Sequence, residues 1–170
     1  MKVLIVSDIH GGYNNMKKVL EDNPEFDLFL ILGDILYGGE EEEKLADLLN
    51  KYTSRIISVC GNCDGFSNTN ILNFFDDKLY VTVPIDGKLV FITHGHVYNR
   101  YNVPNLPYDI YIQGHTHVPV MEYGDKLYLN PGSITRPRGT CGKTYILYDN
   151  GDFSLKSVDD NSVIKKITID

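Results

Sequence analysis

Hydrophobic positions follow two different spacings in the first third of the chain. Unbroken apolar runs occupy residues 3–6 and 28–32, and each is typical of a strand that is buried on both faces. Residues 55–59 predict a third strand. Apolar side chains between these runs recur at helical spacing. They form two stripes, which consist of Met16, Val19 and Leu20 and of Leu45, Leu48 and Leu49. The order strand, helix, strand, helix, strand predicts parallel strands with right-handed crossovers.

The rest of the chain alternates apolar runs with tight turns. Turn signals at Asp86-Gly87, Gly124-Asp125 and Asp149-Asn150-Gly151 predict three hairpins. The predicted strands are 79–83, 88–93, 109–113, 118–123, 126–129, 144–148 and 153–158, with an edge strand at 163–169. These elements predict the α/β class, with two packed mixed β-sheets flanked by helices. We expect one domain over residues 1–170.

Composition narrows the range of partners. The 170 residues carry a formal net charge of −7, which argues against an extended nucleic-acid surface. A small phosphate-ester substrate stays compatible with this charge, because bound cations reverse its sign locally. The apolar runs are too short for a signal peptide or a membrane span, so we expect a cytoplasmic protein without a membrane partner. The three cysteines predict no extracellular disulfide framework, and the oligomeric state stays open.

Residue types that ligate metals follow the ends of five predicted strands. The clusters are Asp8-Ile9-His10, Gly33-Asp34, Gly61-Asn62-Cys63-Asp64, His94-Gly95-His96 and Gly114-His115-Thr116-His117, and they contain all five histidines. Sites in open α/β sheets form outside the carboxyl ends of the strands. Aspartate, histidine and asparagine suit manganese, iron or zinc. Each cluster alone is a weak signal, but the ordered set predicts a metal site.

The ordered set resembles the calcineurin-like metallophosphoesterase superfamily, whose pattern is D-x-H, G-D, G-N-H-D, H and G-H-x-H. The residues within and around the clusters are similar to those of the small YfcE-type phosphodiesterases. The matching segments are Ser7 to Gly11, Gly61 to Asp64, Thr93 to His96, Gly114 to His117 and Asn130-Pro131-Gly132-Ser133. The resemblance covers essentially the whole chain, and it implies the two-sheet fold of that family.

The resemblance also implies two divalent cations, with manganese expected first and iron, zinc or nickel as alternatives. The implied ligands are Asp8, His10 and His117 for one ion, Asn62, His94 and His115 for the other, and Asp34 as a bridge. A hydroxide that bridges the ions would hydrolyse a phosphate ester, and the subfamily favours a phosphodiester. The implied catalytic positions are Asp34, Asn62, Cys63 and His96.

Cys63 departs from the superfamily pattern, although the YfcE-type subfamily shares it. It stands where the superfamily has a histidine, the usual candidate for protonating the leaving oxygen. A thiol has an ordinary pKa of ~8.5 against ~6.5 for imidazole, so it is the weaker acid. Cys60 and Cys63 also form a C-x-x-C pair, which leaves a redox function as an alternative. The loop at residues 35–39 runs straight into an acidic helix and lacks a longer insertion found in some relatives.

Further residues near the clusters have two interpretations each. Arg136 and Arg138 could contact phosphate or be solvated loop charges. Tyr37 could stack on an aromatic leaving group, and His96 could face the substrate or be a loop residue with satisfied hydrogen bonds. We expect Asp64 to orient its neighbours through hydrogen bonds.

Two other functions stay open. One is a phosphomonoesterase or nucleotidase of the same fold. The other is a non-catalytic, retromer-like scaffold, since a eukaryotic retromer subunit shares this small fold. That scaffold is degraded at several ligand positions, whereas this chain keeps all seven. The intact ligand set therefore favours catalysis.

Overall fold

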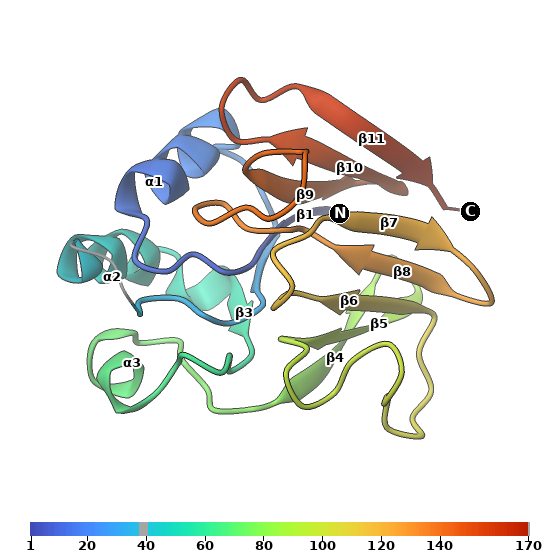
Figure 1. Cartoon of the computed structure of the whole chain (residues 1–170), viewed down its shortest axis with the longest axis horizontal. Helices are drawn as coiled ribbons and strands as arrows, with labels where there is room; N and C mark the ends of the chain where they lie inside the picture. Colours follow the sequence, from blue (N-terminus) through green and yellow to red (C-terminus); the bar gives the residue numbers. More distant parts are fainter. Residues whose placement is uncertain (38–40, 170) are drawn as a thin grey trace.

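The computed structural model describes residues 1–37 and 41–169, without the side chains of residues 66, 67 and 69. Its first half alternates strands and helices, and its second half consists of strands (Figure 1). The first elements are β1 (Lys2–Val6), α1 (Tyr13–Asp22), β2 (Leu28–Ile31), α2 (Glu42–Asn50), the 3₁₀ turn η1 (Thr53–Arg55), β3 (Ile56–Ser58) and α3 (Phe66–Ile71). The later strands are β4 (Tyr80–Ile85), β5 (Lys88–Thr93), β6 (Ile110–Gln113), β7 (Val120–Tyr123), β8 (Leu127–Asn130), β9 (Thr144–Asp149), β10 (Asp152–Ser157) and β11 (Val163–Thr168).

The predicted elements are present, with differences that have local causes. The run predicted at 118–123 becomes a strand only from Val120, because Pro119 lacks the N–H that a ladder needs. Helix α3 was not predicted, since its six residues form no apolar stripe. Residues 38–40, which include part of the loop expected to lack an insertion, lie outside the described residues. Every described helix is too short to cross a bilayer.

The strands form two mixed sheets. The first has the order β11-β10-β9-β1-β2-β3, and the second has the order β4-β5-β6-β8-β7. Strands β1, β2 and β3 are parallel, as the alternating pattern predicted. In the second sheet β5, β6 and β8 are parallel, while β4 and β7 pair antiparallel with their neighbours. Each sheet therefore has a group of three parallel strands whose carboxyl ends point the same way.

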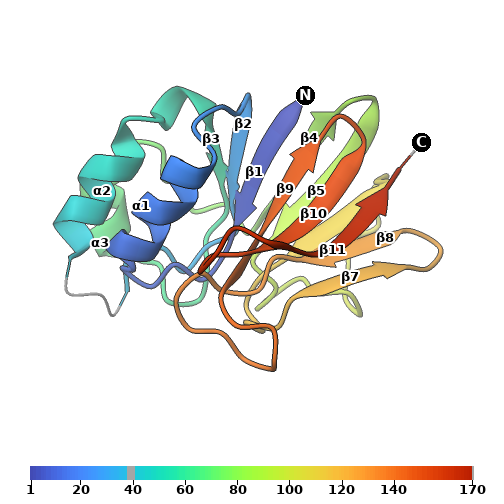
Figure 2. The same cartoon turned by 90° about the horizontal axis from the view of Figure 1, so that it is seen from above.

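Strand β1 shows why its sequence is apolar on both faces. Leu4 and Val6 pack with the helices, whereas Val3 and Ile5 pack against the second sheet. Helices α1, α2 and α3 all lie on the outer face of the first sheet, and the second sheet covers the inner face (Figure 2). The helices therefore flank one sheet only.

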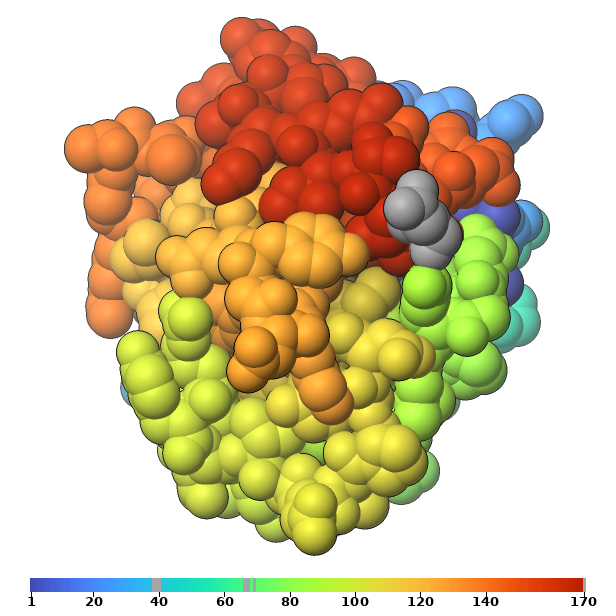
Figure 3. Space-filling view, turned by 90° about the vertical axis from the view of Figure 1, so that its right-hand side faces the viewer, coloured from blue at the N-terminus to red at the C-terminus, as the bar shows by residue number. Residues whose placement is uncertain are grey.

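The outer face of the second sheet is covered differently. A row of stacked rings crosses it, with centroids 5.2 Å apart from Tyr80 to Phe91 and 5.5 Å apart from Phe91 to Tyr111 and from Tyr111 to Tyr128. The connection from β5 to β6, yellow-green in Figure 3, lies over part of this face. Its Tyr98 and Tyr108 contact the same ring row. Aromatic packing thus replaces helices on this side.

Candidate metal centre

The polar clusters converge because the parallel strands of both sheets end at the same edge. Backbone pairing continues past the strand ends, from Asp8 N to Gly33 O at 3.1 Å and from Gly114 N to His94 O at 2.9 Å. The two sheets meet where His94 Nε2 lies 3.5 Å from Asp34 Oδ2. The structure brings together all seven residues that were predicted as ligands.

The backbone at these strand ends adopts a conformation that side chains rarely favour. Five of the seven residues have positive φ, namely Asp8 (53°), His10 (46°), Asp34 (53°), His115 (67°) and His117 (60°). Aspartate and histidine tolerate this region better than most residues, but it still costs of order 1–3 kcal/mol at each position. Such strain clusters at functional sites. Glycine is needed beside it, because a Cβ at Gly61 would collide with the Asp34 carboxylate.

One group of donor atoms consists of Asp8, His10 and His117. Their side chains are 0%, 5% and 7% exposed, so the group is shielded from water. Asp8 Oδ1 lies 3.1 Å from His117 Nε2 and 3.9 Å from His10 Nε2. These three residues can hold a cation together. Below they are called the first half of the centre.

A second group consists of Asn62, His94 and His115, called here the second half. His94 Nε2 lies 3.1 Å from Asn62 Oδ1 and 3.3 Å from His115 Nδ1. Asp34 lies between the two halves, since its Oδ2 is 3.6 Å from His10 Nε2 and 3.5 Å from His94 Nε2. The Asp34 carboxylate is therefore within reach of both groups.

Three histidines are oriented in the same way by backbone carbonyls. The Nδ1 atoms of His10, His94 and His117 lie 3.2, 2.7 and 2.6 Å from carbonyl oxygens. The three carbonyls belong to Tyr37, Leu32 and Arg136, in that order. A hydrogen bond to a carbonyl requires a proton on Nδ1, so a neutral ring has its lone pair on Nε2. This is the arrangement that protein ligands of metals usually adopt.

The Nε2 atoms then face oxygen acceptors. His94 Nε2 points at the Asn62 amide oxygen, and His117 Nε2 points at the Asp8 carboxylate. Two acceptors attract each other only when a proton or a cation lies between them. In addition, His10 Nε2 is buried without a hydrogen-bond partner among the described residues. A bound cation would satisfy these atoms, so the donor set fits a metal.

The charges at the centre are also incomplete without a cation. Asp8 and Asp34 are buried, and the described basic groups within ion-pair distance of them are histidines. Burial opposes ionisation of Asp8, but its hydrogen bond with His117 and further polar contacts outweigh burial, so its pKa is lowered. The same hydrogen bond raises the pKa of His117. Burial lowers the pKa of His10 and of His115.

Several supporting contacts hold these residues in place. As predicted, Asp64 orients its neighbours: it accepts hydrogen bonds from the backbone N–H groups of Asp34, Ile35 and Gly61 at 2.7–2.8 Å. Ser7 Oγ donates to Asp8 Oδ2 at 2.7 Å, and Ser133 Oγ donates to the Asp8 carbonyl at 2.7 Å. The roles of both serines were missed. Both serines stand in segments that match the subfamily, Ser7 to Gly11 and Asn130 to Ser133, which was the available signal.

The cysteines differ from one another in their surroundings. The Cys63 N–H donates to Asp34 Oδ1 at 2.8 Å, and its thiol belongs to a candidate ligand group with His10 and Asp34. Partial burial, followed by the Asp34 carboxylate, raises the pKa of this thiol to about 11. Cys60 is half-buried and Cys141 is exposed, and all three thiols are free.

The two aromatic candidates lie at the margin of the centre. The His96 ring lies 5.3 Å from the His94 ring and 6.3 Å from the His115 ring, and its buried Nδ1 has no hydrogen-bond partner. The Tyr37 side chain is 60% exposed, and only its carbonyl contacts the centre, through His10. A substrate contact by either side chain stays a prediction.

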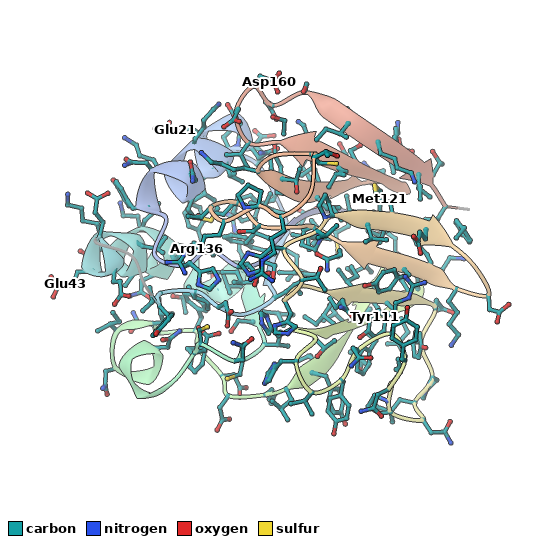
Figure 4. The ribbon with its side chains drawn as sticks, viewed as in Figure 1. Glu21, Glu43, Tyr111, Met121, Arg136 and Asp160 are labelled. Atoms are coloured by element: carbon teal, nitrogen blue, oxygen red, sulfur yellow. The ribbon has the colours of Figure 1, made fainter. Side chains whose placement is uncertain are left out.

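The centre opens into a pocket of about 440 Å³. Its lining consists of His10, Asp34, Asn62, Cys63, His115 and His117 together with Arg136, Pro137 and Arg138. Arg136 lies near the middle of the view in Figure 4, between the helices and the second sheet. Both arginines therefore border the candidate ligands, a position that a phosphate contact would require.

The fold and this site are those of the metallophosphoesterases. The profile of the Calcineurin-like phosphoesterase superfamily domain matches residues 1–152, and the chain belongs to that superfamily. It is 33% identical to Phosphodiesterase YfcE of Escherichia coli K12, over 99% of this chain and 98% of that protein. It is 30% identical to Probable metallophosphoesterase YsnB of Bacillus subtilis 168, over 86% of this chain and 83% of that protein.

Solved structures agree with the sequence relatives. The structure of YfcE, a phosphoesterase from E. coli, matches with a TM-score of 0.92 and 32% identity, over 100% of both chains. Vps29 of Entamoeba histolytica, solved as a complex with Zn²⁺, matches with a TM-score of 0.69 and 21% identity, over 99% of both chains. At 21% identity the second likeness shows a shared fold only.

Proposed function

We propose that this protein is a phosphodiesterase that hydrolyses small phosphate esters at a centre of two divalent cations. One cation would be held by Asp8, His10 and His117, the other by Asn62, His94 and His115, and Asp34 would contact both. The observation that carries the proposal is the pair of acceptors that face each other, Asn62 with His94 and Asp8 with His117, at 3.1 Å in each half. Without a cation, each of these two pairs would need a proton between its nitrogen and its oxygen.

Bound divalent cations would supply a nucleophile from water at neutral pH and neutralise charge on the phosphoryl oxygens. The protein's own residues do the positioning. The carbonyls of Tyr37, Leu32 and Arg136 keep the three Nδ1 atoms protonated, so that the Nε2 atoms stay available as ligands. The ester would approach the centre from the pocket, because the centre is buried on the sides formed by Asp8 and His94. Cys63, on the pocket wall, adds only a weak acid.

The preference for diesters is drawn from similarity to YfcE, whose name is Phosphodiesterase. Manganese is the cation we expect first, with iron, zinc and nickel as alternatives, because the same nitrogen and oxygen ligands accept all four. The cytoplasm is the location we expect. A pocket of about 440 Å³ suits a small ester better than a polymer.

The test is to purify the protein without chelator, reload it with manganese, and measure both metal content and hydrolysis. We expect about two ions per chain and cleavage of bis(4-nitrophenyl) phosphate at neutral to mildly alkaline pH, abolished by chelator. Cleavage of 4-nitrophenyl phosphate alone would replace the diesterase by the monoesterase. Two bound ions without either activity would favour the scaffold. No ions after reloading would refute the proposed centre.

A further inference from the structure

Arginines form one wall of the pocket beside the candidate centre. The chain has four arginines, and two of them, Arg136 and Arg138, line this pocket with Pro137 between them. Of the other two, Arg55 donates to the Phe26 carbonyl and Arg100 pairs with Glu122 at 3.0 Å. The guanidinium of Arg138 forms no ion pair with any described residue. A guanidinium without an ion pair beside a phosphate site can bind an anionic group of the substrate.

The main chain of this wall is attached to the first half of the centre. The Arg136 carbonyl accepts from His117 Nδ1 at 2.6 Å, and the Arg138 N–H donates to the His117 carbonyl at 3.0 Å. The Arg136 N–H also donates to Ser133 Oγ at 2.8 Å. Proline fixes φ at position 137, which stiffens the connection between the two arginines. The side chains therefore start from fixed points next to His117.

The charge of this wall exceeds what the scissile group needs. A phosphodiester carries one negative charge, and the two cations of the proposed function already neutralise its non-bridging oxygens. The protein as a whole is acidic, with a net charge of −7, so most of its surface repels a second anion. Guanidinium groups bind phosphate through two parallel hydrogen bonds. The wall thus has capacity for an additional anionic group.

The pocket also continues past this wall. His10 and Arg136 line an adjoining hollow of about 700 Å³, which extends to Asn14, Asn15 and Lys44. A substrate that reaches the centre therefore has room for a further arm beside Arg136. This hollow is open to solvent, so the arm need not be apolar.

We propose that Arg138, with Arg136 beside it, recognises a second phosphate on the substrate, a phosphomonoester carried on one arm of the diester that is hydrolysed. The inference rests on the proposed function and names its substrate class. Arg138 acts in specificity, since it binds a part of the substrate away from the reacting bonds.

The test compares two 4-nitrophenyl esters of thymidine 5′-phosphate, one with a free 3′-hydroxyl and one with a 3′-phosphate. Both have the same scissile group and leaving group. In the manganese-loaded wild type we expect the 3′-phosphate to raise kcat/KM roughly 10-fold, through KM, as a charge-assisted hydrogen bond allows. Arg138→Gln should bring this ratio to within about 2-fold of unity, and Arg138→Lys should retain part of it. Arg100→Gln, an arginine outside the pocket, is the matched control and should keep the wild-type ratio.

A second measurement needs no turnover. Calorimetry should show that thymidine 3′,5′-bisphosphate binds the wild type roughly 10-fold more tightly than thymidine 5′-phosphate, and that Arg138→Gln loses this difference. No benefit of the 3′-phosphate in either assay would overturn the inference. Equal losses for both esters in Arg138→Gln would also overturn it, because Arg138 would then contact the scissile group. Preferential binding of the bisphosphate without hydrolysis of either ester would support the inference and refute the proposed function.

Discussion

The two halves of the candidate centre differ in burial and in charge. In the first half all three residues are buried, and one of them, Asp8, is a carboxylate. In the second half His94 is fully buried, but Asn62 is exposed, and none of the three residues is a carboxylate; Asp34 lies 3.5 Å from His94 Nε2. Cations are held more tightly by charged ligands in dry surroundings. We therefore expect the first half to bind its ion more tightly, and the second half to face the solvent and the incoming ester.

The difference follows from how each half is built. Both first-half segments, after β1 and after β6, are tied into the core, by the Asp8 carbonyl to Ser133 and by His117 to the Arg136 carbonyl. Asn62 lies in the turn after β3, an edge strand of the first sheet. Its backbone is held indirectly, because the next residue donates its N–H to Asp34 Oδ1. A ligand on a more exposed turn at the sheet edge suits exchange of metal and substrate.

The largest effect should come from the residue that the halves share. Asp34→Asn removes the carboxylate that lies within 3.6 Å of a histidine nitrogen in each half. We expect kcat for an activated diester to fall by at least roughly 10²–10³-fold, because electrostatic stabilisation at the reacting group is lost. Metal analysis should show fewer than two ions per chain.

Asp86→Asn is the matched control for this substitution. Asp86 also has a positive φ, of 44°, but it lies in the β4–β5 turn and pairs with the chain's amino group. It should keep wild-type activity and metal content. Activity in Asp34→Asn within about 10-fold of the wild type would contradict the shared role.

Substitutions that affect one half each should reveal the difference directly. Asp8→Asn keeps an oxygen that can accept from Ser7 and from the His115 N–H, but it removes the charge of the first half. Asn62→Ala removes a neutral, exposed ligand of the second half. We expect affinity at the affected half to fall by about 10²-fold or more, above the roughly 10–100-fold cost of changing groups that merely support ligands. Calorimetric titration with manganese should then show one site in each variant, tighter in Asn62→Ala. Tighter binding in Asp8→Asn would reverse the comparison.

Strand-end positions could be predicted from sequence, whereas the features that orient the ligands could not. Asp8 and His115 are far apart in the chain, but each directly follows a buried parallel strand, so pattern alone places them at one edge. The carbonyls that fix the histidine tautomers are backbone atoms, and any residue type supplies them. Helix α3 was missed because its packing depends on tertiary contacts rather than on a stripe. The difference in burial between the two halves could not be predicted from the sequence either, since the exposure of Asn62 depends on the position of β3 at the sheet edge.

Acid should weaken the first half before the second. The hydrogen bond with Asp8 raises the pKa of His117 above its ordinary 6.5, so in the metal-free protein this ring is protonated at and somewhat above that pH. A cation must then displace the proton. Burial lowers the pKa of His115, so this ring stays neutral until the pH is below 6.5. From pH 8 to 6, manganese affinity should fall in Asn62→Ala by up to about tenfold per pH unit and change less in Asp8→Asn. Equal slopes in the two variants would show that the histidines do not distinguish the halves.

The pairing of His117 with Asp8 also determines how the stability of the metal-free protein changes with pH. Because folding raises the pKa of His117, its pairing with Asp8 stabilises the fold fully below pH 6.5 and loses this contribution as the pH rises through the raised pKa. Manganese reverses the dependence, since it needs the neutral ring. Thermal unfolding of the wild type should therefore show a stabilisation by manganese that grows from pH 6 to pH 8.

The smallest effect should come from Cys63, the pocket residue that follows Asn62. In the metal-free protein, burial and the Asp34 carboxylate raise the pKa of its thiol to about 11, so the thiol is protonated at neutral pH but gives up its proton poorly. A positioned acid of suitable pKa contributes roughly 10²–10⁴-fold to departure of a poor leaving group, and almost nothing to departure of a nitrophenolate. Cys63→Ser should therefore change cleavage of an activated aryl diester by less than about threefold, and activity should not require oxidising conditions. Cys63→His should leave the aryl rate similar but accelerate alkyl esters, because imidazole is the better acid at neutral pH.

The measurement is kcat/KM for a series of diesters graded by leaving-group pKa, in wild type and both variants, with metal content checked. We expect kcat/KM to depend steeply on leaving-group pKa in the wild type and less steeply in Cys63→His. This result would show that the second half, the more exposed side of the centre, lacks an efficient acid. A flat dependence in the wild type, with the chemical step shown to be rate-limiting, would mean that another group, such as His96, already protonates the leaving oxygen.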